Sequence, residues 1–202
     1  DERELPTGRD KLALYLIALE KLSAAGFVPI GMDHFARPDD PLAIAAAAGH
    51  LHRNFMGYAA QPADDMLSFG MTSISEIAGA FAQNDKTLSA WEGPIDAGRL
   101  PVHRGLRRSA DDEARRQIIL DLMCRFALRF DAHGGREAFV ARYADAIDAL
   151  RPMAADGLCR IDDDGITVLE AGRLFVRNLA MPFDAYLTAQ RQAQRPMFSR
   201  TV

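Results

Sequence analysis

The chain has 202 residues, of which 49% are hydrophobic and 26% are charged, a composition typical of a globular protein with its own core. Its net charge of −4 argues against a protein whose main task is to hold nucleic acid or an anionic membrane surface. No apolar run reaches the roughly 18–20 residues needed to cross a bilayer, so we expect neither nucleic acid nor membrane as a partner.

The use of cysteine bears on the compartment and on metal binding. The only two cysteines, Cys124 and Cys159, are too far apart for a local metal-binding motif and too few for a disulfide framework. We therefore expect two reduced, buried thiols, no metal bound by this chain and a cytoplasmic location.

The first predicted elements are a helix over residues 11–25 and a short strand over residues 27–31. Gly26 supplies the stop between them. Five apolar residues recur at the spacing of one helix face: Leu12, Tyr15, Leu16, Leu19 and Leu22. A helix that runs into a strand predicts part of an α/β unit, and such a sheet edge needs partner strands from elsewhere.

The next hundred residues give weaker signals. We predict a short helix over residues 41–48, a strand over residues 54–60 and a helix over residues 76–83. Residues 91–107 are rich in glycine and proline, which favours a loop or short hairpin. We interpret this stretch as the linker between two halves of the chain.

The second half predicts a mainly helical module. Ser109 and Asp112 resemble a capping box at the start of a helix, and a second helix over residues 139–150 should stop before Pro152. Two strands, residues 158–161 and 166–169, flank a turn-forming Asp-Asp-Asp-Gly segment. A last helix from about residue 170 to 186, bent by a proline, completes the outline of a winged-helix-like module.

Two segments carry candidate binding residues. Asp33, His34 and Arg37 follow the first strand, and α/β folds bind ligands at the ends of their strands. The aspartate and the arginine could instead simply pair with each other. His52 and Arg53 could hold a carboxylate, because an arginine fork matches a carboxylate in geometry. Solvated polar residues near a turn explain the second segment equally well.

Several phrases of the sequence resemble the oxygen-independent coproporphyrinogen III oxidase family, a radical-SAM family of haem biosynthesis. The longest is Ile30-Gly-Met-Asp-His-Phe-Ala-Arg-Pro-Asp-Asp40, and its length makes a chance match improbable. The others are Leu51-His-Arg-Asn-Phe55 with Gly57 and Tyr58, Ser73-Ile-Ser75, Ala82-Gln-Asn84, Gly172-Arg-Leu174 with Arg177 and Asn178, Phe183-Asp with Tyr186-Leu, and Phe198-Ser-Arg200.

The resemblance implies an α/β (α+β) fold. Residues 1–104 would form the last elements of a radical-SAM partial barrel, and residues 105–202 the helical, winged-helix-like C-terminal domain. The family's Cys-x3-Cys-x2-Cys loop, which holds a [4Fe–4S] cluster and S-adenosylmethionine, is absent from this sequence. The resemblance therefore implies that both cofactors belong to the full-length enzyme, that this chain retains neither, and that it is inactive alone.

In the full-length enzyme the resemblance implies oxidative decarboxylation of two propionates of coproporphyrinogen III to vinyl groups. It also implies that Ile74 contacts a second S-adenosylmethionine, and it gives His34, Arg37, His52 and Arg53 a purpose as partners of the substrate propionates. Without the N-terminal radical-SAM half, an exposed barrel edge should favour dimers. The alternative function is a haem-binding or tetrapyrrole-binding, chaperone-like module without catalysis; a winged-helix DNA binder is a third hypothesis.

Overall fold

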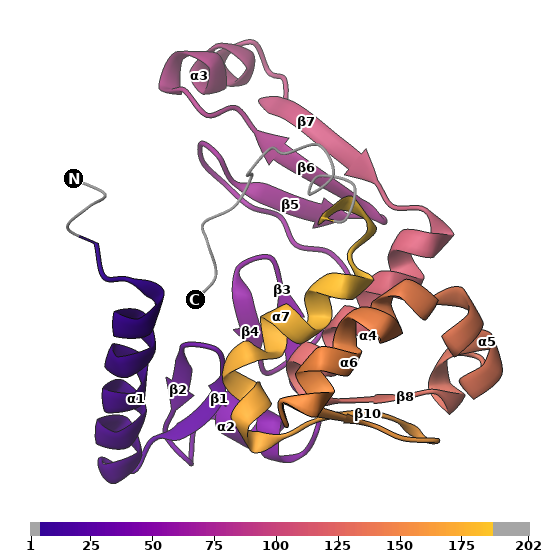
Figure 1. The fold of residues 1–202 in the computed structure, drawn as a ribbon. Helices are drawn as coiled ribbons and strands as arrows, with labels where there is room; N and C mark the ends of the chain where they lie inside the picture. Colours follow the sequence, from indigo (N-terminus) through magenta and orange to yellow (C-terminus); the bar gives the residue numbers. More distant parts are fainter. Residues whose placement is uncertain (1–4, 188–202) are drawn as a thin grey trace.

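The computed structural model describes residues 5–187, and its longest C-terminal helix, α4 (Ala110–Arg125), lies at the centre (Figure 1). Around it lie an N-terminal group with helix α1, a three-stranded arm, and a C-terminal module of helices over a small sheet. Within the described range, no helix is long and apolar enough to cross a membrane. The last phrase of the family resemblance, Phe198-Ser-Arg200, lies outside the described residues.

The predicted helix and strand at the start of the chain are confirmed. Helix α1 (Gly8–Ala24) begins at a capping box in which Thr7 and Asp10 satisfy each other's backbone N–H groups. It ends before Gly26, whose φ of +86° suits glycine, and strand β1 (Val28–Gly31) follows. Strand β1 pairs antiparallel with β2 (His34–Ala36). The barrel to which we assigned them stays a prediction.

The predicted helix over residues 41–48 is confirmed as α2 (Pro41–Ala47), and a second hairpin follows it. Strands β3 (His52–Asn54) and β4 (Gly57–Ala59) pair antiparallel. The single strand predicted over residues 54–60 is therefore wrong. The side-chain oxygen of Asn54 accepts hydrogen bonds from the backbone N–H groups of Met56 and Gly57, and this local bonding reverses the chain.

The arm consists of β5 (Ile74–Ile77), β6 (Ala80–Asn84), α3 (Leu88–Asp96) and β7 (Val102–Arg107), with the strands in that order in one antiparallel sheet. The helix predicted over residues 76–83 is wrong, because Ala78 and Gly79 adopt φ values of +47° and +76° and form a tight hairpin turn. The loop or short hairpin predicted over residues 91–107 is also wrong, because the stretch contains part of α3 and all of β7, and β7 pairs with β6.

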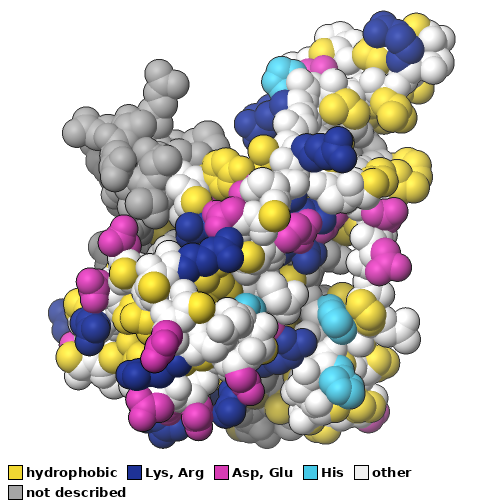
Figure 2. Space-filling model, turned by 90° about the vertical axis from the view of Figure 1, so that its right-hand side faces the viewer, with side chains coloured by type: hydrophobic (Ala, Val, Ile, Leu, Met, Phe, Trp, Pro, Cys, Tyr) yellow, Lys and Arg dark blue, Asp and Glu magenta, His cyan; other side chains and the backbone are white. Residues whose placement is uncertain are grey.

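The predicted domain boundary between residues 104 and 105 falls inside β7, which is hydrogen-bonded to β6 from Val102 to Arg107. The division into two domains itself stays a prediction. The arm projects from the rest of the molecule, and apolar side chains gather on its surface (Figures 1 and 2). Strand β7 is exposed at every residue.

The C-terminal module contains a three-stranded sheet in the order β8-β10-β9. Its strands and helices are β8 (Ala127–Arg129), α5 (Arg136–Arg142), α6 (Ala144–Ala155), β9 (Cys159–Ile161), β10 (Gly165–Val168) and α7 (Val176–Ala180). Three 3-10 helices complete it: η2 (Asp131–His133), η3 (Glu170–Phe175) and η4 (Met181–Phe183). The predicted hairpin over residues 158–169 is confirmed, whereas β8 was not predicted. The winged-helix assignment stays a prediction.

Two helix predictions in this module need correction. The helix predicted over residues 139–150 is two helices that meet at Tyr143, and α6 continues through Pro152 to Ala155. It ends before Gly157, whose φ of +74° allows the chain to turn. The last predicted helix is three short segments, η3, α7 and η4, with a proline inside η4.

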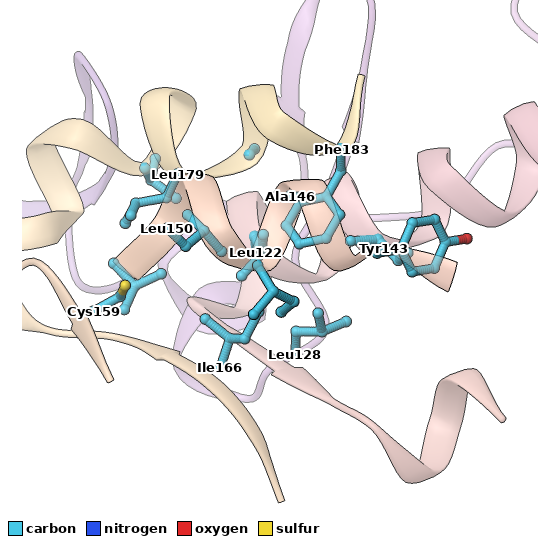
Figure 3. Packing of buried hydrophobic residues seen from close by; sticks show 14 of the residues in the cluster. Leu122, Leu128, Tyr143, Ala146, Leu150, Cys159, Ile166, Leu179 and Phe183 are labelled. Carbon is cyan, nitrogen blue, oxygen red and sulfur yellow. The ribbon is translucent and has the colours of Figure 1, made fainter. Parts of the chain in front are cut away.

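The main core lies between α4, α6, α7 and the small sheet (Figure 3). Leu122, Leu150, Val176, Leu179 and Phe183 are completely inaccessible to solvent. Ring contacts link Phe139 to Phe130, Tyr143 and Phe183, with centroids 4.9–6.0 Å apart. A smaller core joins the N-terminal group to α4 through Ile30, Leu51 and Cys124.

Candidate functional site

A pocket of about 230 Å³ lies between α4, the β3–β4 hairpin and the segment that leads into the arm. Leu51, Leu120 and Cys124 give it an apolar floor, its basic lining residues are His52, Arg53, Arg116 and Arg125, and its acidic lining residues are Asp64 and Glu76. Three arginines from two distant segments therefore meet at one hollow.

Arg53 differs from the other two arginines of the pocket. Its Nη1 atom is buried and has no hydrogen-bond partner, and its guanidinium lies 4.8 Å from the centre of the Tyr58 ring. Within residues 5–187 no carboxylate forms an ion pair with it. The ring contact orients the side chain, but a cation–π contact supplies no acceptor for the N–H groups.

The other two arginines have acidic partners. Arg116 Nη2 lies 2.9 Å from Glu76 Oε1, and Arg108 Nη1 lies 2.7 Å from the same oxygen. Glu76 is 7% exposed, so this cluster fastens β5 of the arm to α4 through buried charge. Arg125 pairs with Asp121 one turn earlier on α4.

The floor of the pocket is apolar and chemically quiet. Burial raises the pKa of the Cys124 thiol to about 11, against weaker opposing effects of Arg53 and Arg125. The thiol is therefore neutral near pH 7 and is no nucleophile there. Cys159 is buried in the main core, and both cysteines are free thiols, as predicted.

The structure brings three of the four predicted substrate residues to one region. His34 packs edge-on against the Tyr58 ring at 5.1 Å, on the ring that also carries Arg53. The Tyr58 hydroxyl donates a 2.9 Å hydrogen bond to the backbone carbonyl of Met123 on α4, and burial raises the pKa of the Tyr58 hydroxyl to about 12. His52 lines the pocket beside Arg53.

Arg37 does not join this group. Its side chain is 74% exposed and pairs at 3.2 Å with Asp39, two residues later. An arginine and an aspartate of this segment therefore pair with each other, which is the alternative that the sequence left open. The acid next to His34, Asp33, contacts the His34 ring at 3.0 Å.

Ile74 begins strand β5 and is half-buried, opposite Gln83 of β6. The loop before it is held by side-chain hydrogen bonds: Ser68 Oγ donates to the Ile74 carbonyl at 2.7 Å, and Asn84 donates to the Gly70 carbonyl at 2.9 Å. This bonded loop carries Phe69, which is 90% exposed. The contact of Ile74 with S-adenosylmethionine stays a prediction.

Comparison with known proteins shows which proteins the chain resembles. Residues 109–175 match the family model described as the HemN C-terminal domain. The chain is 42% identical to the oxygen-independent coproporphyrinogen III oxidase of Synechocystis sp. (strain ATCC 27184 / PCC 6803 / Kazusa), a match that covers 100% of this chain and 44% of that relative. It is 40% identical to the protein of the same name from Thermostichus vulcanus, covering 100% of this chain and 62% of that relative.

A solved structure gives the same result at the level of the fold. Its published description reads "Coproporphyrinogen III oxidase (HemN) from Escherichia coli is a Radical SAM enzyme", and it matches with a TM-score of 0.84 and 38% identity. The match covers 92% of this chain and 43% of that one. The chain resembles the oxygen-independent coproporphyrinogen III oxidases over its whole length. It corresponds to the C-terminal part and spans about 44% of the length of the Synechocystis oxidase.

The comparison with this oxidase family confirms the predicted α+β class and leaves the barrel and winged-helix details open. Sequence reasoning missed Arg116, Arg125 and Tyr58 as neighbours of the predicted residues. The only local signal was the positive charge of two arginines nine residues apart on one predicted helix. That spacing indicates no shared target until the hairpin is placed against α4.

Proposed function

We propose that the full-length protein to which this chain belongs is an oxygen-independent coproporphyrinogen III oxidase of haem biosynthesis. The observation that carries the proposal is the 42% identity to a relative of that name over the whole chain, together with the fold match at a TM-score of 0.84. The reaction removes a hydrogen atom, one electron and CO₂ from each of two propionates, and each –CH₂–CH₂–COO⁻ group becomes a vinyl group.

The [4Fe–4S] cluster and the S-adenosylmethionine bound to it belong, in this proposal, to the full-length protein and are held outside this chain. Residues 5–187 contain no group of three or more Cys, His, Asp or Glu side chains that could hold a metal ion. The two cysteines are buried in different cores and cannot supply three thiolates to one cluster. The two cofactors would supply the radical that takes the hydrogen atom.

The residues of this chain would bind and orient the substrate carboxylates. Arg53 and His52 lie at the pocket, and His34 supports the Tyr58 ring on which Arg53 rests. Arg37 is held by Asp39 at the surface, so its predicted contact with a propionate would require that ion pair to open. We therefore assign it the weakest part in substrate binding.

Ile74 would contact the second S-adenosylmethionine through its apolar side chain, next to the hydrogen-bonded loop that carries Phe69. Ile77, also on β5, faces the other side of the sheet because side chains alternate along a strand. The substitution Ile74→Ala should therefore raise the KM for S-adenosylmethionine, and Ile77→Ala, the matched control, should not.

The remainder of the barrel would cover helix α1. This helix buries none of its residues, and Leu14, Leu16 and Ile17 are each about half exposed. Such a surface is normally covered in a folded protein. When this chain is expressed alone, the same surface should produce dimers, which analytical ultracentrifugation would detect; a monomer at high concentration would contradict the expectation.

The compartment and the alternative function complete the proposal. A cytoplasmic location is supported by two free thiols in place of a disulfide. The chaperone-like alternative has no observation of its own, because the relatives compared above are named as oxidases. A nucleic-acid partner is likewise unsupported, given the net charge of −4.

An anaerobic assay of the reconstituted full-length protein tests the proposal directly. Coproporphyrinogen III, S-adenosylmethionine and a reductant are supplied, and tetrapyrrole products are separated after oxidation to porphyrins. We expect loss of two carboxyl groups and a dependence on S-adenosylmethionine. Stoichiometric tetrapyrrole binding without any decarboxylation would refute the oxidase and favour the chaperone-like module.

A further inference from the structure

The guanidinium of Arg53 is an unneutralised charge at a hollow in the protein. Its Nη1 atom is buried without a hydrogen-bond partner, and no carboxylate of residues 5–187 pairs with it. A half-buried charge without a partner costs free energy, because its N–H groups lose water as a hydrogen-bond acceptor and gain no acceptor from the protein. An anionic ligand that enters the pocket would remove that cost.

The neighbouring charges make Arg53 the cation available to such a ligand. Arg116 is held by Glu76 at 2.9 Å, and Arg125 is held by Asp121 on the same helix. The charges of these two arginines are therefore offset by carboxylates, and their N–H groups are partly engaged. The Tyr58 ring at 4.8 Å fixes the orientation of the Arg53 guanidinium without using its donors.

The size and lining of the pocket restrict the kind of ligand. Its volume of about 230 Å³ lies below the roughly 300–1,000 Å³ of pockets that enclose a whole small molecule. A tetrapyrrole ring cannot enter, but a short chain that ends in a carboxylate can. The floor of Leu51, Leu120 and Cys124 suits methylene groups, and Arg53 suits the carboxylate. Of the two acidic residues in the lining, Asp64 and Glu76, Glu76 is held by Arg108 and Arg116.

We propose that this pocket is a carboxylate subsite in which Arg53 holds one propionate side chain of the tetrapyrrole while the ring stays outside. The methylene groups lie on the apolar floor, and the carboxylate accepts hydrogen bonds from the Arg53 guanidinium after a small rotation of that group. That the carboxylate belongs to a tetrapyrrole rests on the proposed function, whereas the binding of a carboxylate rests on the pocket alone. A propionate held here is anchored, and a different propionate reaches the reacting position.

The test measures the binding of coproporphyrin III, the stable oxidised analogue, to the full-length protein by fluorescence anisotropy. Arg53→Gln should raise the Kd about 10- to 100-fold, the loss expected for a charge-assisted hydrogen bond in a partly buried site. Arg53→Lys should cause a smaller loss, because it keeps the charge but not the fork. This second variant also keeps the test valid if Arg53→Gln does not fold.

Arg151→Gln is the matched control, because Arg151 is 70% exposed on α6 and its one ion pair within residues 5–187 is with Asp148. It should bind coproporphyrin III as the unmodified protein does. The uncharged tetramethyl ester of coproporphyrin III should bind equally to the unmodified protein and to Arg53→Gln. Unchanged coproporphyrin III affinity in both Arg53 variants would overturn the proposal.

Glutarate, a short free dicarboxylate, separates the two possible sources of the carboxylate. Binding of glutarate that depends on Arg53, with coproporphyrin III binding independent of it, would overturn the assignment to the substrate. Turnover of coproporphyrinogen III with unchanged porphyrin affinity in Arg53→Gln would remove the subsite and leave the oxidase intact. Binding of glutarate through Arg53 without any porphyrin binding or turnover would support the carboxylate pocket and remove the oxidase.

Discussion

Replacement of the buried carboxylate of Glu76 tests how the arm is attached to α4. Glu76→Gln leaves an isosteric side chain but removes the charge that faces two guanidinium groups, 2.7 and 2.9 Å away. Removal of one partner from a buried ion pair costs roughly 3–5 kcal/mol. Here Arg108 keeps a bond to Glu113 and Arg116 is one-third exposed to water, so we expect the lower end, about 3 kcal/mol.

The assay is urea unfolding of the unmodified protein and of Glu76→Gln, monitored by circular dichroism, with a thermal melt in parallel. For a chain of this length, about 3 kcal/mol lowers Tm by roughly 6–12 °C. The loss should persist in high salt, because ions screen buried pairs weakly. Glu113→Gln, at a carboxylate that is 45% exposed, is the control and should cost about 1 kcal/mol or less.

Equal costs for the two variants, or a loss below about 1 kcal/mol for Glu76→Gln, would refute the reasoning. Such a result would mean that water reaches the cluster and that the arm is held by other contacts. Proteolysis gives an independent readout, because cleavage within residues 74–107 should accelerate if the arm loosens first. Cleavage spread evenly along the chain would point to global destabilisation without detachment of the arm.

Three further predictions concern packing and ionisation. Gly165→Ala should cost more than about 3 kcal/mol in urea unfolding, because the added Cβ would lie 1.9 Å from the Leu128 carbonyl oxygen. The control is Gly8→Ala, which has open space around it and should change the free energy of unfolding by less than about 1 kcal/mol. Tyr58→Phe should cost about 1–2 kcal/mol, because it leaves a backbone carbonyl of α4 without its donor; an unchanged urea midpoint would contradict this. The pKa of the Cys124 thiol is about 11 in the folded protein, above its ordinary value of 9.0. The contribution of this neutral thiol to the free energy of unfolding is therefore complete below pH 9 and is lost as the pH rises through 11. Iodoacetamide at pH 8 should therefore modify this thiol slowly in the folded protein and rapidly in urea, and equal rates would disprove its burial.

Local chemistry explains which predictions from the sequence succeeded. The helix over residues 11–25 and the helix after Ser109 were predicted because capping residues and apolar spacing act within one or two turns. The hairpin over residues 158–169 was predicted because its turn residues bond to their own backbone. The family resemblance was found in contiguous phrases, and the comparisons confirmed it.

Errors arose where backbone conformation or long-range pairing decided the outcome. Residues 76–83 have a composition that suits a helix, but the turn at Ala78 and Gly79 and the pairing of β6 with β7 make them a hairpin. Alanine is uncommon at positive φ, so no local rule predicted a turn there. Cross-strand hydrogen bonds then overrode the helix propensity.

The sequence by itself determined the family resemblance, the free thiols and the identity of Arg53 and His52 as candidate carboxylate partners. Only the tertiary structure decided that Arg53 faces a pocket, that Glu76 and Asp121 neutralise the other two arginines, and that Arg37 stays with Asp39 at the surface. The physical reason is distance along the chain: Arg53, Glu76 and Arg116 share no local hydrogen-bond pattern. Their electrostatic interaction exists only after the hairpin and the arm pack against α4 and exclude water from the charges between them.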